Sequence, residues 1–325
     1  MTEPSRPLIV RLRNWVGDVT LGLPTLTRLA GAGYDLRLVG KRWARDLLAG
    51  HGWPVEVLPG KKLDRLRLLR RMRAQARAAD PGFDRRLNTL CFPYSFSSAL
   101  ECRLAGLRAL GHAYEGRSLL LARSVPRPQD THELEVYWQL GSALLGADAA
   151  PPAAIGLRAS AAHRRAARAL VQQHAIEPGY IVICPFAGGT WDGKDKTWPG
   201  FAAFAAGPLR GFGRSIVVCP GPGEEAVARE GFGRATLLRG VDLGTYAALL
   251  EEAALMISND TGPGHIAAAV GTPLISVLGP SNPALWGAWG ANVHNVRHPP
   301  GWPTDEEVAA AVARVIPSNP RRTPC

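Results

Sequence analysis

Four polar stretches of the sequence contain residue types that could bind or transfer a charged group. The most distinctive covers residues 258–265 and reads SNDTGPGH, a run of residues that form turns and begin helices. An apolar run precedes it and small apolar residues follow it, which predicts a strand, a tight turn and a helix. Because the first N–H groups of a helix have no partner within the helix, this turn predicts an anion-binding site.

Within this turn, the backbone N–H groups are the natural ligands of a phosphate or diphosphate. Asp260 and Thr261 are the candidate helix caps, and Thr261, Gly262 and Gly264 are the candidate N–H donors. His265 could protonate or bond a phosphate, but a buried structural histidine is an equal alternative. The full set of candidate binding residues here is Asp260, Thr261, Gly262, Pro263, Gly264 and His265.

A second stretch, Asn-Trp-Val-Gly-Asp at residues 14–18, follows the first predicted strand. In a parallel sheet, the carboxyl ends of the strands form the edge at which ligands bind. A carboxylate at this edge, here Asp18, could accept a proton from a sugar hydroxyl as a general base. The alternative is that Asp18 caps a helix beginning at Val19, since aspartate is a favoured cap residue.

A third stretch, FAGGTWDGKDKTWP at residues 186–199, also follows a predicted strand. Its glycine N–H groups, Thr190 and the lysines Lys194 and Lys196 could surround a phosphate. The GK[ST] ending of a Walker A loop is absent, and both lysines could equally be surface charges. Lys196 lies just before a predicted helix start at Trp198, which favours it over Lys194 as a fixed ligand.

The fourth stretch, residues 219–225, places two glutamates between a predicted strand and a helix. Glu224 or Glu225 could accept hydrogen bonds from ribose hydroxyls. The alternative is that both are ordinary acidic residues in a first helical turn, where they interact favourably with the helix dipole.

The elements that must position these residues alternate between strands and helices along the whole chain, which predicts a doubly wound parallel α/β fold. A proline- and alanine-rich break suggests two domains, at residues 1–155 and 156–325, with a ligand cleft between them. Strands are predicted at 8–12, 34–40, 54–58, 86–90, 107–112, 180–184, 215–219, 236–238, 255–257 and 274–278. Helices are predicted at 19–30, 41–50, 61–77, 95–105, 131–146, 160–174, 198–206, 224–230, 243–252, 266–270 and 304–315, with Thr131 and Thr304 as caps, and Pro24 is expected only in an early turn.

The chain of 325 residues has a net charge of +11, which suits a polyanionic partner. Eight Lys and Arg residues and a single acid, Asp64, lie within residues 61–77, where leucines at 63, 66 and 69 predict an amphipathic helix. This helix is either a solvated surface or a contact for a membrane or another polyanion. No zinc-finger, RRM or KH pattern accompanies the charge, so we expect no nucleic-acid partner.

The cysteines and the apolar runs predict the compartment. The five cysteines have no CxxC or paired spacing, which argues against a zinc site or a disulfide framework and predicts buried free thiols at Cys184 and Cys219. No apolar run approaches the length of a membrane span, and the N-terminus lacks the apolar core of a signal peptide. We therefore expect a cytoplasmic protein, for which peripheral association with the inner membrane stays open.

Taken together, these stretches resemble glycosyltransferase family 9, the ADP-heptose:lipopolysaccharide heptosyltransferases. The resemblance covers nearly the whole chain. It lies in IVRLRNWVGDVTLGLPTLTRL at the N-terminus, in KTWP at 196–199, and most specifically in SNDTGPGHIAAAVGTPLISVLGPSNPALWG from residue 258. The forms NWVGD, SFSSAL at 95–100 and GHAYEGR at 111–117 look closest to the heptosyltransferase II branch.

The resemblance implies a GT-B fold, in which two Rossmann-like domains face each other across a cleft. It implies an acceptor site on the first domain, a nucleotide-sugar site on the second, and an inverting transfer of heptose from ADP-heptose to the lipopolysaccharide inner core. No cofactor and no metal are expected, the partners are the nucleotide sugar and an anionic glycolipid at the inner face of the membrane, and the protein is expected to be a monomer. Asp18 is then the general base, and Lys196 stabilises the leaving diphosphate together with the Thr261–Gly264 turn.

The resemblance also implies roles for residues that hold the donor. Glu224 or Glu225 would bind the ribose, and Asp260 would bind the heptose hydroxyls. Gly189 and Thr190 fall near phosphate-contacting positions of the family, although the segment Trp-Asp-Gly-Lys-Asp replaces a shorter spacer there.

Three alternatives stay open from the sequence. The chain could transfer another sugar or use another acceptor, such as a protein. It could be a non-catalytic GT-B protein that only binds carbohydrate or nucleotide, which the presence of both Asp18 and Lys196 disfavours. It could be a basic nucleic-acid binder, which the absence of binding motifs disfavours.

Overall fold

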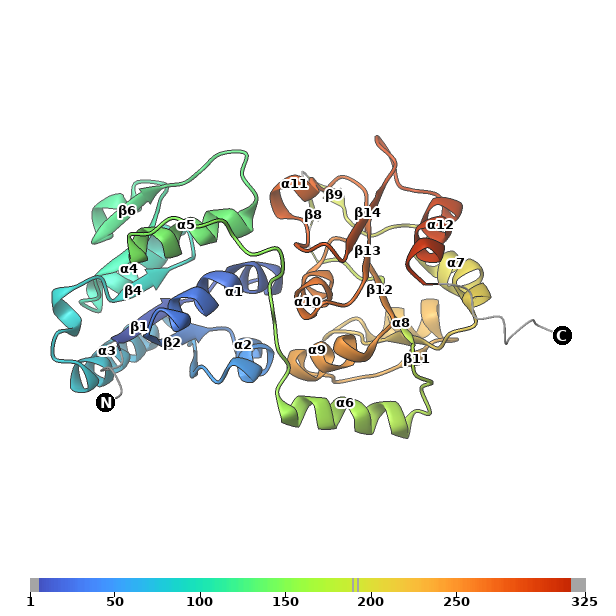
Figure 1. The fold of residues 1–325 in the computed structure, drawn as a ribbon, viewed down its shortest axis with the longest axis horizontal. Coiled ribbons are helices and arrows are strands. Elements are labelled where there is room, and N and C mark those ends of the chain that lie inside the picture. The colour runs from blue at the N-terminus through green and yellow to red at the C-terminus, as the bar shows by residue number, and fades with distance from the viewer. Residues whose placement is uncertain (1–5, 189, 192, 317–325) are drawn as a thin grey trace. The chain divides into compact units, whose positions relative to one another are not determined.

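The computed structural model describes residues 6–188, 190–191 and 193–316. The chain divides into two compact units between Pro152 and Ala153, close to the boundary expected near residue 155. Each unit is built on its own six-stranded parallel sheet with helices on both faces, so the expected doubly wound α/β fold is confirmed (Figure 1).

The N-terminal unit has the strand order β3-β2-β1-β4-β5-β6. Successive strands are added on one side of β1 up to β3 and on its other side from β4 onward, and all of them stay parallel. Its central strand β1 is buried along most of its length and pairs with β2 from Arg6–Tyr34 to Arg11–Val39. The strands are β1 (Arg6–Arg11), β2 (Tyr34–Gly40), β3 (Val55–Val57), β4 (Thr89–Cys91), β5 (Ala109–Ala113) and β6 (Arg123–Pro126).

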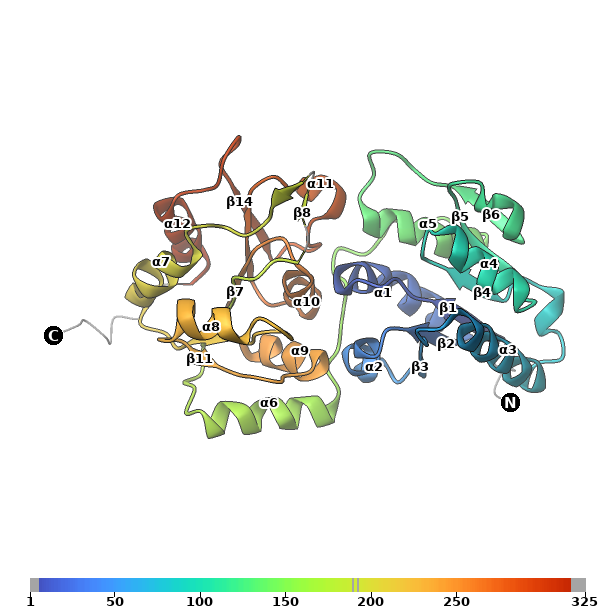
Figure 2. The same cartoon turned by 180° about the vertical axis from the view of Figure 1, so that it is seen from behind.

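The helices of this unit cover both faces of the sheet. The pair α1 and α5 pack against each other, and α3 and α4 form a second pair whose apolar residues share one core with β1 and β4 (Figure 2). The helices are α1 (Val16–Gly31), α2 (Trp43–Leu48), α3 (Lys62–Ala79), α4 (Phe96–Leu104) and α5 (Glu133–Leu145), with 3₁₀ turns at Ala49–His51, Phe83–Arg85 and Arg117–Leu120.

The C-terminal unit repeats this plan with the order β11-β10-β7-β12-β13-β14. Its four central strands are almost fully buried, as expected for a parallel sheet covered on both faces. The strands are β7 (Ile181–Cys184), β10 (Ile216–Val218), β11 (Thr236–Leu237), β12 (Leu255–Ser258), β13 (Leu274–Leu278) and β14 (Val293–Arg297), and β8 (Thr190–Trp191) and β9 (Lys194–Asp195) form a separate hairpin.

Figure 1 shows α9 and α10 on one side of this sheet and α7 and α12 on the other. One apolar core joins the second side to β7, β10, β12 and β13 and includes the rings of Trp198, Phe201 and Phe204. The helices are α6 (Ala161–Gln173), α7 (Phe201–Ala206), α8 (Glu225–Phe232), α9 (Leu243–Glu252), α10 (Gly262–Val270), α11 (Pro283–Trp286) and α12 (Asp305–Val315), with a 3₁₀ turn at Pro208–Phe212.

Two expectations for the first helix were wrong. The helix begins at Val16 rather than at Val19, so Asp18 lies inside its first turn. Pro24 lies in the middle of α1 rather than in an early turn. Proline cannot donate the hydrogen bond that the carbonyl of Thr20 would accept, but burial of the helix against α5 and the sheet outweighs this loss.

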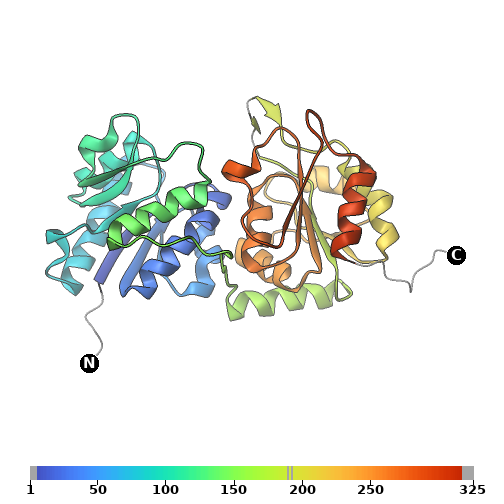
Figure 3. The same ribbon diagram turned by 45° about the horizontal axis from the view of Figure 1, so that its top comes forward.

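Other elements were missed or displaced. The edge strands β6 and β14 and the short helix α11 were not predicted, and residues 190–195 form a hairpin where a loop was expected. Gly193, at a φ of +74°, lies at the turn of this hairpin, which projects beyond the rest of its unit (Figure 3). His132 rather than Thr131 caps α5, because its ring nitrogen accepts the N–H of Leu134. Thr304 caps α12 as expected and forms a capping box with Glu307.

The basic helix is confirmed as α3, but its apolar stripe differs from the expected one. Leu63 is 69% exposed, and the buried residues are Leu68, Leu69, Met72 and Ala76. Many of its arginines are already bonded within the unit, for example Arg65 to Glu101 and Arg73 to Asp84. No helix in the described part of the chain is long and apolar enough to span a bilayer.

Candidate functional site

The carboxylate of Asp18 lies at the carboxyl end of β1, in the first turn of α1, and is 7% exposed. It does not cap the helix, because the N-cap position belongs to Trp15 and no side chain bonds the first N–H groups there. Oδ1 of Asp18 instead accepts the Tyr137 hydroxyl at 2.6 Å and Nε of Arg13 at 3.2 Å. The capping alternative for Asp18 is therefore wrong, and the carboxylate belongs to a side-chain network.

This network continues to a second buried carboxylate, Glu133, which is 1% exposed at the start of α5. Glu133 accepts the hydroxyl of Tyr94, which follows β4, and Nη2 of Arg127 at 3.0 Å. The guanidinium carbons of Arg13 and Arg127 lie 4.5 Å and 4.9 Å from the centroid of the Tyr94 ring. We call this group the Asp18 cluster, and its members are Arg13, Asp18, Tyr94, Arg127, Glu133 and Tyr137.

The protonation states in this cluster follow from its burial. Burial raises the pKa of Glu133 above its usual range, against the opposite effect of the neighbouring Tyr94, Tyr137 and Arg127. Burial, followed by the charge of Asp18, raises the pKa of Tyr137 far above that of a free phenol. Burial alone would lower the pKa of Arg13, but the surrounding acidic groups raise it overall. Tyr137 and Arg13 therefore keep their protons and serve Asp18 as donors.

The expected anion site at the start of α10 has the predicted backbone geometry. Thr261 holds the N-cap position, its side chain bonds none of the helix N–H groups, and Pro263 lies in the first turn. The first N–H with a backbone partner is that of His265, which donates to the carbonyl of Thr261 at 3.3 Å. In the described part of the chain, the N–H groups of Thr261, Gly262 and Gly264 have no hydrogen-bond partner, so all three can donate to an anion.

Lys196 is brought to this turn by the fold. Its Nζ donates to the backbone carbonyl of Asp260 at 3.0 Å, although 64 positions separate the two residues. The ammonium group of Lys196 thus lies at the turn that also presents the free N–H groups at the start of α10. This geometry can stabilise a diphosphate.

Asn259 holds the two loops together and was missed by the sequence reasoning. Its side chain is buried, accepts the N–H of Trp198 at 2.9 Å and donates to the carbonyl of Pro185 at 2.8 Å. It therefore fixes both ends of the segment that carries Lys196 against the turn before α10. Asparagine is so common in turns that its presence there gave no signal for this role.

Gly264 shows how closely α10 approaches the sheet. A Cβ atom at this position would lie 2.6 Å from Oγ of Ser258 on β12, closer than real Cβ atoms come to other atoms. His265, the next residue, is 6% exposed, so it lies in the interior of the unit. The glycine therefore lets the helix start, and its free N–H groups, lie directly over the carboxyl end of β12.

The two candidate glutamates differ in the structure. Glu224 holds the N-cap position of α8, and its carboxylate accepts the N–H of Gly221 at 2.7 Å, which closes the turn after β10. Glu225 is exposed in the first turn of α8, the position of an ordinary acidic residue. Glu224 is therefore the better fixed of the two at the carboxyl edge of this sheet.

The structure does not bring the other two candidates to the turn. Thr190 and Lys194 lie exposed on the β8–β9 hairpin, and neither side chain bonds another of the described residues. Gly189 lies outside the described residues. Asp260 is half-buried at the turn and contributes its carbonyl to Lys196.

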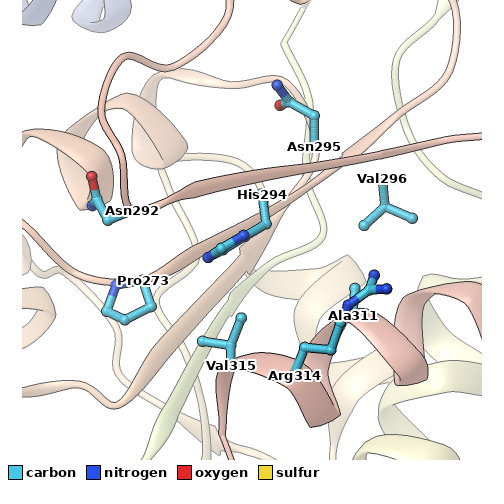
Figure 4. A pocket seen from close by; sticks show the side chains of 8 residues that line it. All are labelled: Pro273, Asn292, His294, Asn295, Val296, Ala311, Arg314 and Val315. Carbon is cyan, nitrogen blue, oxygen red and sulfur yellow. The ribbon is translucent and has the colours of Figure 1, made fainter. Parts of the chain in front are cut away.

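One hollow in the C-terminal unit, of about 470 Å³, lies elsewhere, between β14 and α12 (Figure 4). Pro273 and Asn292, which precede β13 and β14, place it near the amino ends of the strands. His294 and Asn295 point to opposite sides of β14, and Asn292 bonds the carbonyls of Ala268 and Thr272. None of the candidate site residues lines this hollow. Ligands of doubly wound sheets bind at the opposite, carboxyl edge.

Within each unit taken alone, the described residues contain no group of three His, Cys, Asp or Glu side chains close enough to hold one ion. Cys91, Cys102 and Cys184 are buried free thiols, and Cys219 is half-buried.

Comparison with protein families gives a match over most of the chain. The model of glycosyltransferase family 9 (heptosyltransferase) matches residues 67–311. Among curated proteins, lipopolysaccharide heptosyltransferase 1 of Escherichia coli strain RS218 is 37% identical over 101 residues, 30% of this chain and 31% of that protein. Lipopolysaccharide heptosyltransferase 3 of E. coli is 34% identical over 128 residues, 36% of each chain. The matched stretches thus span about a third of these relatives.

Solved structures match the fold over nearly the whole chain. The E. coli ADP-heptose lps heptosyltransferase II has a TM-score of 0.78 at 20% identity and covers 95% of this chain and 98% of its own. The E. coli heptosyltransferase WaaC with ADP has a TM-score of 0.69 at 24% identity, with coverage of 95% and 100%. A family 9 glycosyl transferase from Veillonella parvula has a TM-score of 0.74 at 18% identity, with coverage of 91% and 87%. At these identities the likeness shows a shared fold.

Proposed function

Because the chain belongs to glycosyltransferase family 9, we propose that it is a heptosyltransferase that moves heptose from ADP-heptose to the lipopolysaccharide inner core. The relatives named as lipopolysaccharide heptosyltransferases support this acceptor. Two structures of the E. coli heptosyltransferase WaaC, one with ADP and one with ADP-2-deoxy-2-fluoro heptose, support the donor. We place the reaction at the cytoplasmic face of the inner membrane, where the net charge of +11 suits an anionic glycolipid.

The observation that carries the proposal is the turn before α10, where Lys196 bonds the Asp260 carbonyl beside three free N–H groups. These donors would bind the diphosphate of the nucleotide sugar. They would also stabilise the negative charge that develops on it when the glycosidic bond breaks. Glu224, fixed by Gly221, would bind the ribose hydroxyls, and Asp260 would bind hydroxyls of the heptose.

The N-terminal unit would supply the acceptor site and the base. Asp18 takes the proton from the acceptor hydroxyl while that oxygen forms a bond to the anomeric carbon of heptose. The bond from this carbon to the diphosphate breaks, and ADP leaves with the bonding electrons. A single displacement of this kind inverts the anomeric configuration. We propose that it needs no metal, since Lys196 and the N–H groups supply the electrophilic contacts.

The proposal is tested with the purified full-length chain, ADP-heptose and a set of defined truncated lipopolysaccharides. We expect one acceptor to gain a single heptose in the mass spectrum, with equal rates in magnesium and in EDTA and with inverted configuration by NMR. Parallel reactions with other nucleotide sugars, and with a protein acceptor, test the alternatives. Transfer from another donor, transfer only to protein, or a strict metal requirement would each contradict the corresponding part of the proposal.

A further inference from the structure

The Asp18 cluster holds its carboxylate with more side-chain contacts than a general base alone requires. Its six side chains come from five segments of the N-terminal unit: the β1–α1 connection, the first turn of α1, the residues after β4, the segment after β6, and α5. Tyr137 lies 119 positions from Asp18 in sequence, yet the 2.6 Å bond between them is one of the shorter ones in the molecule. Such long-range convergence on one carboxylate indicates that its orientation matters.

Both donors to Asp18 end on the same oxygen. The Tyr137 hydroxyl and Nε of Arg13 both reach Oδ1, and no hydrogen bond reaches Oδ2 from any residue that the structure describes. Two donors fix the rotation of the carboxylate as well as its place. They also make the two oxygens chemically different, because Oδ1 is already engaged and Oδ2 keeps its lone pairs available.

The donors are themselves held rigidly. The Tyr137 ring is fully buried and packs on Phe92, with ring centroids 5.0 Å apart. The guanidinium of Arg13 lies over the Tyr94 ring, and the Tyr94 hydroxyl is tied to Glu133. Since each donor has a second anchor, neither can follow Asp18 if the carboxylate rotates.

We propose that Tyr137 and Arg13 are positioning residues that hold Oδ1 of Asp18, so that Oδ2 is the oxygen that accepts the proton of the acceptor hydroxyl. This inference rests on the proposed role of Asp18 as the base. The proton moves from the acceptor hydroxyl to Oδ2 while the acceptor oxygen forms its bond to the anomeric carbon. The bond from this carbon to the diphosphate breaks, and its electron pair leaves with ADP. Oδ1 keeps its two hydrogen bonds throughout.

The decisive variant is Tyr137→Phe, which removes the hydroxyl and keeps the buried ring. We expect kcat to fall about tenfold to a hundredfold, because misplacing a reacting group by about 1 Å can reduce a rate on the order of 10²-fold. We expect the KM for the donor to stay unchanged, since the donor-binding residues lie in the other unit.

Tyr180→Phe is the matched control, because it removes an equally short bond of a buried tyrosine, from its hydroxyl to the Leu249 carbonyl at 2.6 Å in the C-terminal unit. It should lower the melting temperature about as much as Tyr137→Phe but leave kcat unchanged. Arg13→Lys is the second positioning variant, which keeps the charge and loses the fixed Nε–H. It should lower kcat and leave the KM for the donor unchanged, and it keeps the proposal testable if Tyr137→Phe does not fold.

The outcomes separate this inference from the proposed function. If Asp18→Asn is inactive but Tyr137→Phe and Arg13→Lys keep the wild-type kcat, the positioning role is overturned and the base survives. If Asp18→Asn stays active, the base assignment fails, and the positioning role in catalysis fails with it. If no sugar is transferred by the wild type, the proposed function fails, and the positioning role in catalysis is overturned with it.

Discussion

At the carboxyl edge of the N-terminal sheet, the groups available for chemistry are side chains, and they are buried in a network of ions and phenols. At the same edge of the C-terminal sheet, they are backbone N–H groups, supported by one lysine and one asparagine that bond the backbone. The two units share a strand order but differ in the chemical groups, side chain or backbone, that each presents at its carboxyl edge.

The difference matches what each half of the proposed reaction requires. A base has to change its protonation state, which only a titratable side chain can do, so its surroundings must control both its orientation and its charge. A leaving diphosphate needs donors that stay donors at every working pH, and backbone N–H groups do not titrate. Substitutions in the N-terminal unit should therefore act directly on the reacting groups. In the C-terminal unit, substitutions other than those of Lys196 should act mainly through the placement of the backbone.

The largest effect should come from removing the base. We expect Asp18→Asn to lower kcat by roughly 10²–10⁴-fold, the usual contribution of general-base catalysis, with little change in ADP affinity measured by calorimetry. Asp35→Asn is the control, because Asp35 also pairs with an arginine of the N-terminal unit, Arg37, and is far more exposed. An unchanged kcat in Asp18→Asn would mean that the N-terminal edge does not supply the base, and the proposed division of roles between the two edges would fail.

Lys196→Ala should have the next largest effect, because it removes the ammonium group that bonds the Asp260 carbonyl at the turn before α10. We expect a loss in kcat on the order of 10²-fold, comparable with the loss of one oxyanion donor, together with weaker ADP binding. Lys196→Arg should recover part of the activity, since it restores the charge but not the bond geometry to the Asp260 carbonyl. Arg210→Ala, an exposed cation of the same unit, serves as the control. A fall in kcat with unchanged ADP binding would show that Lys196 stabilises the diphosphate only in the transition state.

Gly264→Ala tests the backbone side of the comparison without changing any functional group. The added methyl group would meet Ser258 Oγ at 2.6 Å, so α10 has to shift away from β12. We expect a destabilisation of about 1–3 kcal/mol, as for other overpacked sites, and roughly tenfold weaker ADP binding. Gly231→Ala in α8 is the control, since its Cβ meets no atom within 4 Å and should be neutral or stabilising. Unchanged ADP binding in a destabilised Gly264→Ala would show that the helix start does not hold the diphosphate.

The sequence predicted the alternation of both sheets because buried strands have continuous apolar runs. The strands it missed, β6 and β14, are both edge strands with exposed side chains, RSVP and VHNVR, so their only signal is a hydrogen-bonded neighbour that is distant in sequence. The hairpin was missed although the Asp-Gly pair at 192–193 is a known hairpin signal, since the flanking residues, Thr-Trp and Lys-Asp, do not alternate between apolar and polar.

The sequence also placed the free N–H groups of α10, because glycine, proline and a cap residue fix a helix start locally. It could not place the partners of Asp18. Tyr137 was counted as part of the apolar face of a helix, and only the tertiary fold shows that its hydroxyl reaches a carboxylate 119 positions away. The bond of Lys196 to the Asp260 carbonyl depends in the same way on a loop closure that Asn259 enforces.

The smallest expected effect concerns the pH dependence of stability, which should have opposite signs in the two units. Burial raises the pKa of Glu133 in the N-terminal unit. In the C-terminal unit, burial would raise the pKa of Glu251, but its bonds to Arg164 and to the N–H of Ala159 lower it overall. A raised carboxyl pKa gives stability that is present below the unfolded pKa, about 4.3, and is lost as the pH rises through the folded value. A lowered pKa gives stability that is present above about 4.3 and is lost as the pH falls through the folded value.

Melting temperatures of the wild type, Glu133→Gln and Glu251→Gln between pH 3 and pH 8 test this prediction. The advantage of the wild type over Glu251→Gln should be roughly 1–3 °C at neutral pH, as for a partly exposed ion pair, and should vanish below the ordinary glutamate range. The advantage of the wild type over Glu133→Gln should instead shrink as the pH rises from about 4, because only the wild type has to ionise a buried group. If the melting-temperature differences of the two variants change with pH in the same direction, burial does not raise the pKa of Glu133, and this part of the comparison is wrong.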